Sequence, residues 1–231
     1  MKDIKVTLLM LILVMLNASH ATARSESHSF RRAISPSQTS VNLAAGPMRV
    51  YFFDGFIVPL PLGILSINKI KDHVEFLKHE RNLDVQFLSI HNSQWKSVCK
   101  DLNNLSDREK PKRLILIGHS YGGDAAISIS HCVGSQPVDL VVTIDTVEKI
   151  FHKDTDIVPE NVIANYNYYE SIDPVLIFHG KSNNRRTDGS HRGIVNVHVA
   201  AFPIPVNAHY KPLTEMASNG TIAGLLDLYL K

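Results

Sequence analysis

Short apolar runs recur along the chain from position 48 onward, and each ends at glycine or polar residues. This pattern is typical of buried strands. The run after Arg113 is apolar at four consecutive positions, and a strand that is apolar on both faces indicates a parallel sheet covered by helices. The predicted strands are residues 49–53, 84–90, 113–117 and 138–144, with 175–178 and 195–202 as further candidates.

Between these runs, apolar residues recur three and four positions apart, as they do along one face of a helix. The predicted helices are residues 63–79, 95–105, 123–133 and 213–230, the last with weak points at Gly220 and Gly224. Alternating strands and helices joined by right-handed crossovers predict an α/β fold with a doubly wound, mostly parallel sheet and helices on both faces. In such sheets ligands bind at the carboxyl ends of the strands, so candidate chemistry is sought there.

The first 23 residues carry the three regions of an export signal peptide in order. Lys2 and Lys5 give a basic start, the run from 6 to 16 is apolar except for Thr7, and residues 21–23 (Ala-Thr-Ala) match the small-x-small cleavage pattern. The apolar run is too short to span a bilayer, which needs about 20 residues. We therefore expect an exported protein, periplasmic or secreted, without a stable membrane anchor.

Residues 24–47 are rich in Ser, Thr, Ala and Asn and have no apolar period, which predicts a flexible leader before a single domain over 48–231. The formal net charge is only +2, so a nucleic-acid surface, which needs clustered Lys and Arg, is not expected. Cys99 and Cys132 fall in predicted helices that flank one strand. They either pair or stay as buried thiols, and neither lies in a zinc-binding pattern.

The strongest chemical motif is the sequence Gly-His-Ser-Tyr-Gly-Gly at 118–123. It fits G-x-S-x-G, follows the most apolar predicted strand and opens a helix of small residues, which is the strand–turn–helix context of a nucleophile elbow. The glycines allow a sharp, strained turn and close packing of strand and helix. Ser120 is therefore the candidate nucleophile, and the alternative is a glycine-rich turn with an incidental serine.

At this point the chain resembles the α/β-hydrolase superfamily, and most of all its small bacterial lipase- and thioesterase-like members. The resemblance covers about 48–231 and rests on Asp54-Gly55-Phe56, the Ser120 elbow, the strand 141–145 and the late His209. It implies an α/β-hydrolase fold and a triad in the chain order Ser, acid, His.

Asp145 ends the strand that follows the nucleophile helix, at the same predicted sheet edge as Ser120, so it is the first candidate for the acid. The thioesterase-like hydrolases resemble this chain in placing the acid there, whereas many superfamily members place it one strand later. Asp188 is the second candidate and Asp173 the third. An aspartate that merely caps a strand end is the alternative for Asp145.

Among the late histidines, His209 is the candidate base, because it is expected in the loop between the last strand and the final helix, where this fold delivers its base. His198 lies within a strand pattern and His191 in a polar loop; His179 is the fourth. His119, next to the nucleophile, is expected to point the other way across the elbow and to serve in packing.

The expected oxyanion hole consists of two backbone N–H groups, from Tyr121 after the nucleophile and from Phe56 after the first strand. The apolar loop 56–62 either lines an acyl pocket or packs in the core. The polar and tyrosine-rich segment 161–169 and the segment 183–186 are expected to lie over the site as cap elements.

These features predict a serine hydrolase that cleaves a small-molecule carboxylic ester or thioester through an acyl-enzyme, with no metal and no organic cofactor. The alternatives are an amidase or perhydrolase-like enzyme on the same scaffold, or a non-catalytic exported binding protein with a hydrolase-like fold. The sequence specifies neither the acyl chain length nor the oligomeric state.

Overall fold

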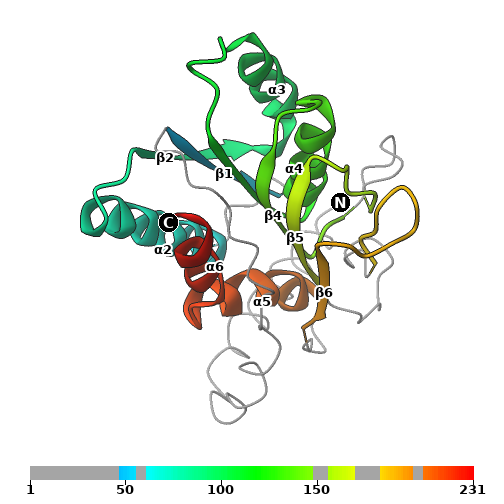
Figure 1. Cartoon of the computed structure of the whole chain (residues 1–231). Coiled ribbons are helices and arrows are strands. Elements are labelled where there is room, and N and C mark those ends of the chain that lie inside the picture. Colours follow the sequence, from blue (N-terminus) through cyan, green and yellow to red (C-terminus); the bar gives the residue numbers. More distant parts are fainter. Residues whose placement is uncertain (1–46, 56–60, 148–155, 170–182, 200–204) are drawn as a thin grey trace, which may run out of the picture. The chain divides into compact units, whose positions relative to one another are not determined.

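The computed structural model describes residues 47–55, 61–147, 156–169, 183–199 and 205–231, and for 61–63 and 205–211 it describes the backbone alone. The expected signal peptide and leader, Phe56 and the strand candidate 175–178 therefore lie outside the described residues. The described residues are shown in colour in Figure 1.

Six strands form one sheet in which every pairing is parallel. The sheet order is β2-β1-β3-β4-β5-β6. The strands are β1 (Met48–Asp54), β2 (Val85–His91), β3 (Arg113–His119), β4 (Val138–Ile144), β5 (Val162–Tyr169) and β6 (Ile194–His198). β3 and β4 are buried at every position, as expected for strands covered on both faces.

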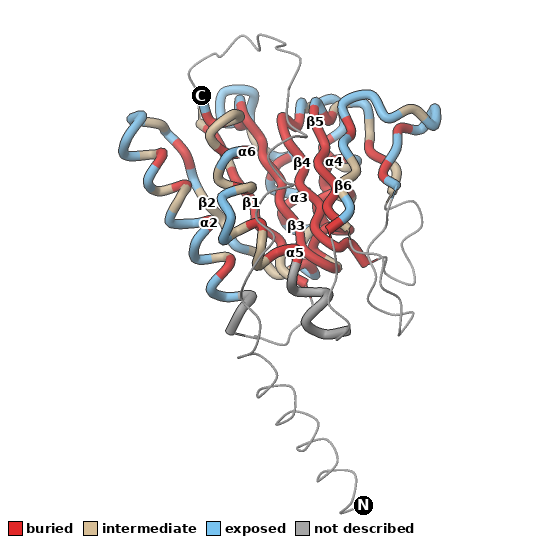
Figure 2. Tube along the Cα trace, turned by 90° about the horizontal axis from the view of Figure 1, so that it is seen from below, coloured by how far each residue is buried: buried red, intermediate tan, exposed pale blue. Residues whose placement is uncertain are grey.

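Helices cover both faces of this sheet, so the predicted doubly wound α/β fold is confirmed. One core layer joins the sheet to α2 (Pro61–Glu80), α5 (Pro205–Ser218) and α6 (Thr221–Tyr229). The other joins it to α3 (Trp95–Asn104) and α4 (Tyr121–Cys132), and the short 3₁₀ helix η3 (Asn92–Gln94) precedes α3. Figure 2 shows that buried positions follow the strands, while α2 turns exposed positions outward.

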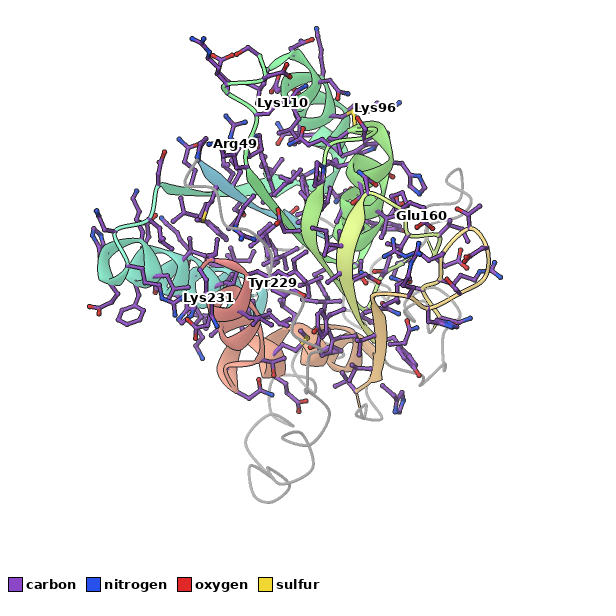
Figure 3. All side chains as sticks on the ribbon, in the orientation of Figure 1. Arg49, Lys96, Lys110, Glu160, Tyr229 and Lys231 are labelled. Carbon is purple, nitrogen blue, oxygen red and sulfur yellow. A yellow bond between two sulfur atoms is a disulfide. The ribbon has the colours of Figure 1, made fainter. Side chains whose placement is uncertain are left out.

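Side chains fill the layer between the sheet and the C-terminal helix (Figure 3). Tyr229 of α6 lies there, and burial together with a hydrogen bond to Tyr166 of β5 raises the pKa of its phenol. The predicted helix 213–230 is two helices, because Gly220 takes a left-handed conformation (φ 79°) between α5 and α6. α5 also begins earlier than predicted and contains Pro212.

The expectation that residues 161–169 form a cap is wrong, because 162–169 is strand β5 of the sheet. Its inward polar side chains are satisfied by one another and by neighbours, which is why a polar segment is stable there. Asn167 accepts from Thr143 of β4 (3.0 Å) and donates to Asn196 of β6 (2.9 Å). Asn184 donates to Asn165 (2.9 Å) and to Thr143 (3.2 Å).

Asn184 and Arg186 are both buried. Because Asn184 bonds to β4 and β5, the second expected cap segment, 183–186, is anchored on the sheet. The guanidinium of Arg186 donates to the backbone carbonyls of Pro159, Val162 and Arg192.

A disulfide joins Cys99 of α3 to Cys132 of α4, with 6.2 Å between their Cα atoms. This resolves the two alternatives for the cysteines in favour of pairing. Among the described residues, no helix is long and apolar enough to cross a membrane.

Candidate active site

Ser120 lies at the sharp turn between β3 and α4, at the carboxyl edge of the sheet. Its backbone is in a rarely populated region (φ 57°, ψ −127°), and the residue is nearly fully buried. Such strain in a residue other than glycine persists only where the surrounding structure imposes it, and it is typical of functional turns. The strand–turn–helix context predicted from the motif is therefore present.

The glycines around Ser120 stand where no larger residue fits. A Cβ on Gly122 would collide with the Phe53 carbonyl of β1, and one on Gly118 would collide with the backbone of Gly122. A Cβ on Gly55, just after β1, would lie 2.7 Å from the Cβ and 3.1 Å from the Oγ of Ser120. The end of β1 is thus in direct contact with the candidate nucleophile.

This contact falls at the point where the sheet order changes direction. From β1 the chain goes to β2 on one side and then to β3 on the other. Crevices at such switch points, outside the carboxyl ends of the strands, are where open α/β sheets bind ligands. Gly55 and Ser120 lie on the two sides of this point.

Asp145 follows β4, the strand next to the nucleophile strand. The backbone N–H of Ser120 donates to the carbonyl of Ile144 at 2.9 Å, so the two chain segments lie side by side. The N–H of Asp145 donates to Tyr168 at 2.6 Å, and Thr146 packs against Gly123 of α4. Asp145 is fully buried and also has positive φ (46°), so Ser120 and Asp145 are two strained residues at neighbouring strand ends.

The rival acids are placed differently. Asp188 is exposed in the turn before β6, and its carboxylate accepts a hydrogen bond from the backbone N–H of Ser190 at 2.9 Å. That bond lowers the pKa of Asp188. Asp173 lies outside the described residues. The geometry therefore favours Asp145 over Asp188 as the partner of the elbow.

The candidate base lies in a helix. His209 was expected in a loop, but residues 205–218 form α5, so that placement is wrong; its side chain is outside the described residues. His198 ends β6 and packs against the ring of Tyr169, with centroids 5.4 Å apart. The ring of His191 bonds to the side chain of Asn183, and His119 is buried. His179 is outside the described residues.

Of the two predicted oxyanion donors, Tyr121 is the first residue of α4 and Phe56 is outside the described residues. Gly55, which precedes Phe56, is described. The carbonyl of Gly55 accepts a hydrogen bond from the side chain of Asn92 at 2.6 Å. Asn92 opens η3 directly after β2 and is buried. Asn92 was not among the predicted site residues, although it is a polar residue directly after a strand, which is the signal that identified Asp145.

Asp54, the last residue of β1, was also not predicted to have a role at the site. It pairs in register with His91 of β2. Burial raises the pKa of its carboxyl group, while the nearby His91 and the N–H of Asn92 oppose that rise. Within the described part of the chain, Asp54 Oδ1 and His91 Nε2 are buried atoms that make no hydrogen bond. Titratable groups are therefore gathered beside the elbow.

Among the described residues, no group of three or more His, Cys, Asp or Glu side chains is arranged to hold a metal ion.

No protein-family model matches the chain, and no curated protein matches it. Among solved structures, it is similar to a proposed hydrolase of the alpha/beta superfamily from Xanthomonas campestris pv. campestris. That match has 10% sequence identity and a TM-score of 0.41, and it covers 78% of this chain and 99% of the other. A periplasmic ribose ABC transporter structure from Conexibacter woesei matches with 14% identity and a TM-score of 0.32, covering 69% of this chain and 56% of the other.

Proposed function

We propose that this protein is an exported serine hydrolase of the α/β-hydrolase type that cleaves a carboxylic ester or thioester. The observation that carries the proposal is the strained backbone of Ser120 between a fully buried strand and a helix that begins at Tyr121. A serine held in this way presents its hydroxyl at the carboxyl edge of the sheet, at the positive end of a helix.

In the proposed reaction, Ser120 Oγ attacks the acyl carbonyl while the imidazole of His209 takes the hydroxyl proton. The tetrahedral intermediate then collapses: the bond to the leaving oxygen or sulfur breaks, and His209 gives the proton to that atom. Water hydrolyses the resulting acyl-enzyme by the same steps. Asp145 orients the imidazole, and its place beside the elbow supports this role. The N–H groups of Tyr121 and Phe56 stabilise the oxyanion.

Two features support export. The first 23 residues carry the pattern of a signal peptide, and Cys99 and Cys132 form a disulfide, which persists in oxidising compartments. We also propose that the enzyme is lipase- or thioesterase-like, and that it acts in the periplasm or in the medium.

The test compares wild type with Ser120→Ala on short p-nitrophenyl esters and acyl thioesters. Ser130→Ala is the matched control, because Ser130 is a buried serine of the same helix whose hydroxyl donates to the backbone carbonyl of Ala126. We expect Ser120→Ala to lose activity by about 10⁴-fold or more and to lose labelling by a fluorophosphonate probe, while Ser130→Ala keeps both. Equal turnover by wild type and Ser120→Ala would refute the proposal.

A further inference from the structure

Thr146 follows Asp145 just after β4 and is 1% exposed, and its side chain covers the first turn of α4. A Cβ on Gly123 would lie 2.1 Å from the Oγ1, 2.9 Å from the Cβ and 3.0 Å from the Cγ2 of Thr146. The three heavy atoms nearest to that position therefore all belong to one side chain. Gly123 is not among the glycines with positive φ, so the absence of a side chain there serves the approach of Thr146 and not the backbone conformation.

The two residues that flank Asp145 are both attached to the turn that carries Ser120. Before Asp145, the carbonyl of Ile144 accepts the backbone N–H of Ser120 at 2.9 Å. After it, Thr146 packs on Gly123, whose own N–H donates to the carbonyl of Ser120 at 2.9 Å. Asp145 joins these two attachments in a left-handed conformation (φ 46°), which a residue other than glycine keeps only where surrounding contacts impose it.

The shape of Thr146, and not its hydroxyl, makes this contact. Thr146 Oγ1 is buried and makes no hydrogen bond. A buried hydroxyl without a partner costs free energy instead of supplying it. The side chain therefore acts on Gly123 through the volume of its atoms.

We infer that Thr146 is a positioning residue for Asp145. Its contact with Gly123 holds the strained turn at Asp145 against the helix that begins after Ser120, and this fixes the place of the carboxylate relative to the nucleophile. The inference rests on the proposed function, in which Asp145 orients the base, and adds a residue to it. A carboxylate orients an imidazole only from a fixed place, and a displacement of about 1 Å can cost about 100-fold in rate.

The experiment measures kcat and KM for ester hydrolysis, and the melting temperature, for wild type, Thr146→Val and Thr146→Ala. Valine keeps the shape and removes the unbonded hydroxyl, so we expect kcat within about threefold of wild type and an equal or higher melting temperature. Alanine removes Oγ1 and Cγ2, which face Gly123, so we expect kcat to fall by about 10- to 100-fold with KM within about twofold.

Thr214→Ala is the matched control. The hydroxyl of Thr214 in α5 is also buried without a hydrogen bond, so this variant removes a similar group elsewhere in the fold. It should keep kcat within about twofold even if its melting temperature falls.

A double-mutant cycle with Asp145→Asn separates positioning from a general loss of structure. If Thr146 acts through Asp145, Thr146→Ala should lower the kcat of Asp145→Asn by less than about twofold, because the carboxylate that Thr146 positions is already absent. A purely structural role would lower kcat by the same factor in both backgrounds. If Thr146→Ala fails to fold, Thr146→Ser takes its place in the cycle, because it removes only Cγ2.

Three results would overturn the inference: wild-type kcat in Thr146→Ala, an equal loss in Thr146→Val, or equal factors in the two backgrounds of the cycle. If turnover depends on Ser120 and Asp145 but not on Thr146, only this inference fails. If turnover does not depend on Asp145, the assignment of the acid fails with it. If turnover does not depend on Ser120, the proposed function itself fails.

Discussion

Ser120 and Asp145 share a backbone property that their side chains do not reveal: both have positive φ, at 57° and 46°. Such conformations cost about 1–3 kcal/mol each, and they persist where surrounding contacts impose them. The sequence identified both residues, Ser120 by its motif and Asp145 by its position after a buried strand. It did not identify Asn92, because that side chain bonds to the carbonyl of Gly55, which lies 37 positions away in the sequence.

At Asp145, the proposed triad predicts a large loss of turnover when the carboxylate is removed. Asp145→Asn keeps the shape but no longer fixes the imidazole in the required tautomer, so kcat should fall by about 10⁴-fold. Asp188→Asn is the matched control, because Asp188 is exposed and bonded within its own turn. We expect less than a twofold change there, measured as steady-state ester hydrolysis. The reverse result would assign the acid to Asp188.

At Asp54, the prediction concerns the pH dependence of stability. Its pKa is raised above the ordinary 3.8 in the folded protein, mainly by burial. At a pH between 3.8 and the folded pKa, the folded state therefore keeps a proton that the unfolded chain has released. The contribution of Asp54 to folding therefore declines as pH rises from 3.8 through its folded pKa. Asp54→Asn should raise the melting temperature at pH 7 and leave it unchanged near pH 3.5.

The control for this pH series is the exposed Asp101 of α3. Asp101→Asn removes an exposed carboxylate, so it should change the melting temperature at pH 7 less than Asp54→Asn does. An equal effect of the two substitutions from pH 3.5 to 7 would contradict the assignment.

At the scale of elements, apolar patterns predicted β1 to β4 and α2 to α4 closely, because burial on one or both faces leaves a period in the sequence. Two elements were misjudged. β5 carries Asn165 and Asn167, whose hydrogen-bond partners Asn184 and Asn196 arrive later in the chain, so local polarity gave no sign of a buried strand. In α5, Pro212 removes a backbone donor inside the helix, so the sequence pattern predicts a helix only after this residue.

The disulfide between α3 and α4 yields a prediction at this scale. Cys99 and Cys132 are 33 positions apart, and closing a loop of this length stabilises a fold by about 3–4 kcal/mol in the chain-entropy model. The Cys99→Ala, Cys132→Ala double variant should lose about that much in urea unfolding. Mild reduction of the wild type should lower its unfolding midpoint similarly, and an unchanged midpoint in both cases would show that the bond contributes little.

At the scale of the molecule, the alternation of strands and helices predicted a doubly wound sheet, and the strand order explains why the site lies where it does. The change of direction between β1 and β3 brings Gly55 to Ser120. The strand order depends on the face of the sheet over which each crossover connection passes. Contacts between segments that are distant in the sequence determine that face. The carboxyl-edge rule therefore located the elbow, Asp145 and the segment after β1. The contact of Asn92, which follows β2, required the structure.

Arg186 lies in the segment before β6 and is almost fully buried. It donates to the carbonyls of Pro159 and Val162 at the start of β5 and to that of Arg192 in its own segment. Arg186→Met should lower the free energy of unfolding by about 2–4 kcal/mol, because those carbonyls lose charged donors. Arg186→Lys should recover little, since a single ammonium cannot replace a planar fork. Arg185→Met, at the neighbouring exposed ion pair with Asp156, should cost less than about 1 kcal/mol in the same denaturant titration.

The strand order also matters for chains that are not yet complete. From β3 onward, each strand pairs with the strand that precedes it in the chain, so the order in the sheet follows the order of synthesis. A chain that stops after β3 or β4 ends in an edge whose every residue is buried in the finished fold, and such an edge invites aggregation. In the finished fold β5, with its asparagines, and the partly exposed β6 cover that edge, so a truncated chain that lacks them should aggregate more readily than the full chain.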